Sequence, residues 1–70
     1  MRTRTYYTLV LRDDGDLRWR IEFGDYDRDT VEAEMESYTD HDYLKRNAKI
    51  IRSGDSQADI DAAVDALNAS

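Results

Sequence analysis

The side chains best suited to chemistry in this chain are carboxylates, and they are gathered in one short segment. Residues 25–42 contain eight acidic side chains and one arginine, while the whole 70-residue chain has a net charge of −6. Carboxylates this dense can bind a metal ion, stabilise the start of a helix or contact a basic surface. The candidates for such contacts are Asp25, Asp27, Asp29, Glu32, Glu36 and Asp40.

A metal site is the weakest of these interpretations. An Asp-x-Asp-x-Asp pattern starts at Asp25 and has an acid at its twelfth position, Glu36, as in a calcium-binding loop. The sixth position is Thr30, however, where such loops need glycine for a sharp turn. The chain has no cysteine and a single histidine, so thiolate zinc sites are excluded and we expect no metal and no other cofactor.

Catalytic groups are equally sparse. The histidine, His41, lies between Asp40 and Asp42, and no nucleophile stands at a spacing that supports a catalytic pair. Only three glycines occur, none in a phosphate-binding loop, and 70 residues leave little room for a closed site. We therefore expect no enzyme activity and no catalytic residues.

Two interpretations of the acidic segment remain. In the first, its carboxylates cap a helix and keep its outer face solvated, as in many soluble proteins and in proteins of halophilic hosts. In the second, they form a surface that binds a basic groove of a protein, because an acidic helix repeats its charge on the length scale of a nucleic acid backbone. The same negative field repels phosphates, so direct binding of nucleic acid is not expected.

The first half of the chain predicts a β-hairpin followed by a helix. Residues 4–12 are rich in Thr, Tyr and Val, and Asp13–Asp16 contains the Asp-Gly pair of a tight turn. In residues 17–23, apolar and charged side chains alternate, which predicts a strand with one buried face. The apolar members of this pattern are Leu17, Trp19, Ile21 and Phe23.

A helix is predicted over residues 28–38, with Asp27 or Asp29 as its N-cap. Val31, Met35 and Tyr38 recur at helical spacing and form its buried stripe.

The second half predicts a short strand over residues 48–52 and a helix over residues 57–68. The inner stripe of this second helix is Ile60, Ala63, Val64 and Leu67.

The predicted order, β-β-α-β-α, describes a single α+β domain over residues 1–70. A right-handed crossover places the third strand beside the first, so we expect a three-stranded antiparallel sheet of order 2-1-3, with two helices packed on one face. The other face is then open. It would carry an alternative interface formed by Tyr6, Val10, Arg18 and Arg20, residue types that suit a protein contact, a homodimer among them.

Residues 6–34 (YYTLVLRDDGDLRWRIEFGDYDRDTVEAE) and 49–69 (KIIRSGDSQADIDAAVDALNA) resemble small proteins encoded by phages and prophages of GC-rich bacteria. This class-level resemblance covers most of the chain and brings no catalytic motif. It implies a type of role, since short, acidic, cysteine-free phage proteins include anti-CRISPR proteins and other inhibitors of host defence, several of which mimic nucleic acids.

The resulting expectation is a phage-type inhibitor that binds the basic surface of a host nucleic-acid-binding complex through its acidic helix. The alternative is a structural or accessory phage protein that assembles through the open sheet face or a strand edge. No apolar run approaches 18 residues and no leader pattern opens the chain, so we expect no membrane span, no signal peptide and a place in the host cytoplasm.

Overall fold

The computed structural model describes residues 4–41 and 43–69, which form three strands, two α-helices and one short 3₁₀ turn. In chain order these elements are β1 (Thr5–Leu11), β2 (Arg20–Asp25), α1 (Arg28–His41), η1 (Lys45–Asn47), β3 (Ala48–Gly54) and α2 (Gln57–Ala69). The predicted α+β class and the element order are therefore confirmed.

The sheet is antiparallel and has β1 at its centre, in the order β2-β1-β3 that the crossover rule predicts. Leu9 of β1 lies opposite Phe23 on one side and Ile50 on the other. The seven pairs between β1 and β3 follow one unbroken register, whereas the pairing of β1 with β2 shifts by one residue between Leu9 and Val10.

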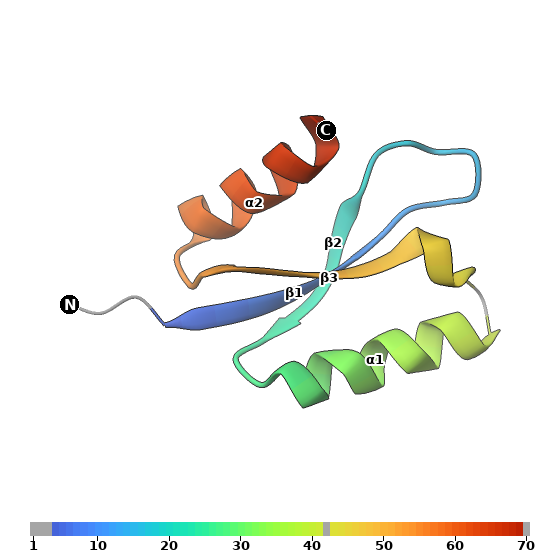
Figure 1. Cartoon of the computed structure of the whole chain (residues 1–70), viewed down its shortest axis with the longest axis horizontal. Helices are drawn as coiled ribbons and strands as arrows, with labels where there is room; N and C mark the ends of the chain where they lie inside the picture. Colours follow the sequence, from blue (N-terminus) through green and yellow to red (C-terminus); the bar gives the residue numbers. More distant parts are fainter. Residues whose placement is uncertain (1–3, 42, 70) are drawn as a thin grey trace.

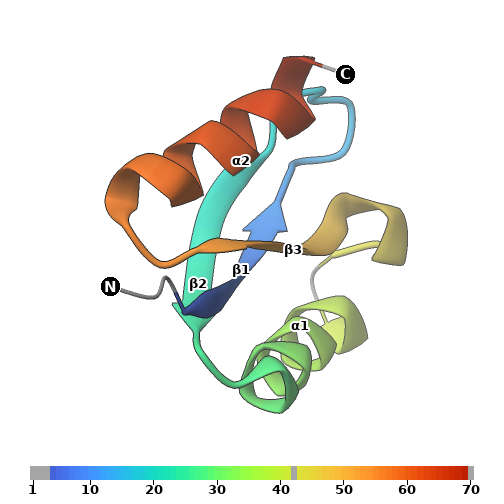
Figure 2. The same cartoon turned by 60° about the vertical axis from the view of Figure 1, so that its left-hand side comes forward.

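The two helices lie on opposite faces of the sheet, with α2 above the strands and α1 below them in Figure 1, and on either side of them again in Figure 2. The expectation that both helices share one face is therefore wrong. On the α1 side, Leu9 and Leu11 are fully buried with Val31. On the other side, where α2 lies, Thr8 and Val10 of β1 are buried, and so are Ile60 and Val64 of the helix itself.

The physical reason is visible in β1. Its central run of Thr8, Leu9, Val10 and Leu11 is completely buried, so neighbouring side chains that point to opposite faces both need cover. A strand covered on both faces has a continuous apolar run instead of an alternation. Ile50 and Ile51 of β3 are also consecutive apolar residues that point to opposite faces.

The predicted strand over residues 17–23 is only partly correct. β2 begins at Arg20, and Leu17 is 84% exposed in the loop before it. A β-bulge leaves Glu22 with no residue opposite it on β1, because Leu9 pairs with Phe23 and Val10 with Ile21. One extra residue reverses the alternation, so Phe23 joins the α1 side while Ile21 turns to the other face and is 45% exposed.

The turn and both helices lie where the sequence places them. Gly15 adopts a φ of +88° in the hairpin turn, which the Asp16 N–H closes onto the Asp13 carbonyl at 2.9 Å. Val31, Met35 and Tyr38 form the inner stripe of α1, which continues to His41, three residues beyond the predicted end. No helix in the described residues is long and apolar enough to cross a bilayer.

Candidate partner-binding surfaces

The first carboxylates of the acidic segment accept hydrogen bonds from neighbouring residues of the chain. Asp27 is the N-cap of α1, since its carboxylate accepts hydrogen bonds from the Asp29 N–H at 3.0 Å and the Thr30 hydroxyl at 3.2 Å. The Asp25 carboxylate accepts a bond from the Asp27 N–H at 2.8 Å. Both side chains therefore fix the turn from β2 into α1 and are less free to contact a partner.

Glu32 is also engaged. Its carboxylate accepts a hydrogen bond from Arg28 Nε at 3.1 Å, one helical turn earlier. Both side chains are about half exposed, so the pair contributes little to stability, but it places an arginine charge beside the Glu32 carboxylate.

Three carboxylates remain exposed on the outer side of α1, and we name Asp29, Glu36 and Asp40 the acidic line. At about 100° per residue they lie roughly 140° to 180° around the helix from the buried Val31. At 1.5 Å rise per residue, Glu36 lies about 10 Å along the axis from Asp29 and about 6 Å from Asp40. Among the described residues, no side chain bonds to any of these three carboxylates, so they are available to a partner. Asp42 lies outside the described residues.

Tyr38 sits beside a second group of acids at the inner edge of α1. Its hydroxyl donates a hydrogen bond to Glu22 at 3.2 Å, and its ring meets Tyr43 edge-on at 5.9 Å. Partial burial, together with Glu22 and the nearby charge of Glu34, raises the pKa of Tyr38 above its ordinary value. These contacts anchor the bulged part of β2 to the helix.

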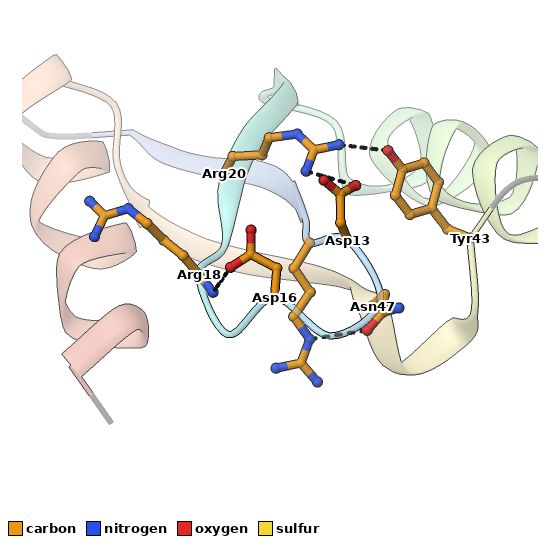
Figure 3. A network of polar contacts seen from close by, with 7 residues as sticks. Asp13, Asp16, Arg18, Arg20, Tyr43 and Asn47 are labelled. Carbon is orange, nitrogen blue, oxygen red and sulfur yellow. Dashed lines mark hydrogen bonds and ion pairs between the residues drawn. The ribbon is translucent and has the colours of Figure 1, made fainter.

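A polar network joins the hairpin loop to the segment after α1 (Figure 3). Arg20 donates to the Tyr43 hydroxyl at 2.6 Å and to Asp13 at 3.4 Å. Arg46 pairs with Asp14 at 3.0 Å, and this hydrogen bond holds the pKa of Asp14 below its ordinary value. A depression of about 600 Å³ opens here, but both of its carboxylates, Asp13 and Asp14, already have arginine partners.

The alternative interface is not assembled by the structure. Val10 is fully buried, so it lies on no exposed face. Tyr6 packs over Gly24, where an added Cβ would come within 2.5 Å of its hydroxyl, and meets Tyr26 edge-on at 5.0 Å. Arg18 is exposed and, in Figure 3, points away from Arg20, whose guanidinium reaches toward Tyr43. The expectation of an open sheet face is therefore wrong, because α2 covers it.

Sequence reasoning also missed Asn68 near the end of α2. Its side-chain oxygen accepts a hydrogen bond from the Trp19 N–H at 2.7 Å, and its amide donates to the Trp19 carbonyl at 3.1 Å. The side chain thus pairs with the main chain just before β2, as a neighbouring strand would. The one available signal was an amide in an otherwise alanine-rich helix end.

His41 is exposed in the last turn of α1, and no three metal-binding side chains converge within residues 4–41 and 43–69. Comparison with protein families, with curated proteins and with solved structures finds no match. The case for a function therefore depends on the surfaces of this chain alone.

Proposed function

We propose that this protein is a non-catalytic binding protein that uses the acidic line to occupy the basic, nucleic-acid-binding groove of another protein. The observation that carries the proposal is the freedom of Asp29, Glu36 and Asp40. Their carboxylates have no partner among the described residues and face directly away from the core. A basic groove would supply the missing partners and lose its ability to hold nucleic acid.

Charge and spacing support this kind of target. The carboxylates recur over about 16 Å along one rigid helix, and a duplex offers one phosphate charge per about 1.7 Å of axis. A groove shaped for phosphates can therefore contact several of these carboxylates together. Association through them should be fast and sensitive to salt, since the charges are exposed.

The host setting comes from the resemblance to small phage proteins. On that basis the target is a defence complex of a bacterial host, of the kind that anti-CRISPR proteins inhibit, and the protein acts in the host cytoplasm. The alternative, assembly as an accessory phage protein, would use the strand edges, because a helix lies on each face of the sheet.

The test compares two matched charge reversals. Glu36→Lys with Asp40→Lys changes the acidic line, whereas Asp61→Lys with Asp65→Lys makes the same change at the same spacing on α2. Each tagged protein is used to capture partners from a bacterial lysate at low and at high salt, and each captured protein is then assayed for binding to labelled DNA.

We expect the wild type and the α2 variant to capture a nucleic-acid-binding protein at low salt and to displace its DNA. The α1 variant should do neither. Equal capture and equal displacement by all three proteins would remove the acidic line from the mechanism. Captured partners that never bind nucleic acid would overturn the mimicry.

A further inference from the structure

The two edges of the sheet are treated differently by the rest of the chain. At β2, the bulge at Glu22 interrupts the register and Asn68 pairs with the main chain of Trp19. Both features hinder the addition of another strand. At β3 neither feature is present among the described residues, and the strand keeps one register with β1 over seven residues.

The outward groups of β3 follow from its register. The Arg12 N–H donates to the Asn47 carbonyl at 3.0 Å, so this pair is a hydrogen-bonded one. Hydrogen-bonded pairs alternate along an antiparallel ladder. The amides of Lys49 and Ile51 therefore face β1, while those of Ile50 and Arg52 face away from the sheet. Among the described residues, nothing accepts a hydrogen bond from these two outward amides.

The side chains of this edge are basic. Lys49 and Arg52 are exposed, and within the part of the chain that the structure describes neither has a carboxylate partner. Arg4 adds a third charge at the end of the strand, where its guanidinium stacks on Tyr26 at 4.1 Å. Arg4 and Arg52 line a depression of about 340 Å³ with Thr5, Ser53 and Gly54.

We infer that the β3 edge binds an extended acidic peptide segment of a partner by strand addition. The outward amides of Ile50 and Arg52 would give the main-chain hydrogen bonds, and the basic side chains would select carboxylates. Lys49 and Arg52 are three residues apart and lie on opposite faces, so the segment needs carboxylates at the same separation. A second copy of this chain is disfavoured, because its own Lys49 and Arg52 would meet like charges.

This inference goes beyond the proposed function, because it concerns a basic edge and not the acidic line. It is tested with a fluorescent peptide, Thr-Glu-Val-Thr-Glu-Val-Thr, measured by anisotropy against the whole protein. The same peptide with lysine in place of glutamate is the charge control. Two further peptides carry N-methyl groups on alternate amides, one in each register, because methylation blocks strand pairing without changing charge.

Two single reversals complete the experiment. Arg52→Glu alters the edge, and Arg18→Glu makes the same charge change at an exposed arginine in the β1–β2 loop. We expect the acidic peptide to bind about tenfold more weakly to the Arg52→Glu protein than to the Arg18→Glu protein. One of the two methylated peptides should lose binding, and bound peptide should slow amide exchange at Ile50 and Arg52.

The inference is overturned if the acidic peptide binds no better than the lysine peptide, or if both methylated peptides bind like the parent. Equal affinity for the two arginine variants would also overturn it. If Arg52→Glu unfolds the protein, the methylated peptides and the exchange of the Ile50 amide in the wild type decide the outcome alone.

Discussion

The two sides of the sheet carry the same kind of cover, one helix each, but they are built differently. On the α1 side, Leu9, Leu11 and Val31 are fully buried and a ring of aromatic side chains with Met35 surrounds them. On the α2 side, the buried residues are Thr8, Val10, Ile60 and Val64, and the Thr8 hydroxyl has no hydrogen-bond partner among the described residues. The α1 side is therefore the main apolar core, and α2 also relies on the polar contact of Asn68 with Trp19.

The difference between the two sides of the sheet bears on where the helices can carry charged side chains. A helix held by a strong inner stripe tolerates free carboxylates on its outer side, and α1 places three of them there. The outer side of α2 carries exposed alanines at Ala58, Ala62 and Ala66 together with exposed aspartates at Asp61 and Asp65. Exposed carboxylates therefore occur on both helices, and the matched charge reversals on α1 and α2 separate the acidic line from a general effect of surface charge.

The largest expected effect is a loss of stability when the core on the α1 side is truncated. Leu9→Ala should lower the free energy of unfolding by about 3 kcal/mol, because it leaves a cavity between β1 and α1. Val64→Ala removes less buried surface, so its loss should be clearly smaller. Urea unfolding followed by circular dichroism gives both values. Equal losses would show that the two sides contribute equally, and a Leu9→Ala chain that is unfolded without urea would agree with our expectation.

The helix caps give the next effect. Asp27→Ala removes two hydrogen bonds and a favourable charge from the start of α1 and should cost about 1 kcal/mol of unfolding free energy. Ser56→Ala removes a single bond, from the Asp59 N–H at 3.1 Å, so it should cost less. Asp27→Asn keeps an acceptor and serves as the control. A larger cost at Ser56 than at Asp27 in the same urea experiment would contradict this order.

A gain in stability is expected at Thr8. Thr8→Val replaces a buried hydroxyl, which has no partner within the described part of the chain, with a methyl group, and this should raise the unfolding free energy by about 1 kcal/mol. Thr5→Val makes the same change at an exposed position of β1 and should alter it by less than about 0.5 kcal/mol. Loss of stability in the Thr8→Val protein would mean that its hydroxyl is satisfied in solution.

The smallest effect concerns two tyrosines, Tyr26 just before α1 and Tyr38 within it. The hydrogen bond to Asp55, at 3.0 Å, raises the pKa of Tyr26, and partial burial with the bond to Glu22 raises that of Tyr38. Because folding favours the neutral phenols, their contribution is present below the unfolded pKa of about 10 and is lost as the pH rises through the folded value.

Ring-carbon NMR can follow each phenol separately. Asp55→Asn should lower the pKa of Tyr26 and leave that of Tyr38 unchanged. Glu22→Gln should lower the pKa of Tyr38 and leave that of Tyr26 unchanged. A common shift of both tyrosines in either variant would point to a general change in the fold.

Much of the fold could be predicted from the sequence because it follows from local patterns. The turn at Gly15, the stripe of Val31 and Met35 and the strand order depend on neighbours in the chain or on a general handedness rule. The bulge at Glu22 could not be predicted, since the uninterrupted alternation of residues 17–23 gives no sign of an extra residue.

The sequence predicted which segment carries the acidic side chains, and the structure showed which of their carboxylates are free among the described residues. Density of charge identifies the acidic segment, but it does not say which carboxylates the molecule uses itself. Asp25, Asp27 and Glu32 bond to nearby donors, and this depends on where the helix begins. The assignment of Val10 to an interface failed for a different reason, because the burial of both faces of β1 requires the position of α2.

The place of β1 at the centre of the sheet has a consequence for how the protein is made. β1 leaves the ribosome before both of its neighbours, and one of them, β3, is complete only at Gly54. Until then the run from Thr8 to Leu11 lacks half of its ladder and the helix that covers its second face. The nascent chain must therefore carry this apolar run with one face and one edge uncovered until β3 and α2 have both emerged.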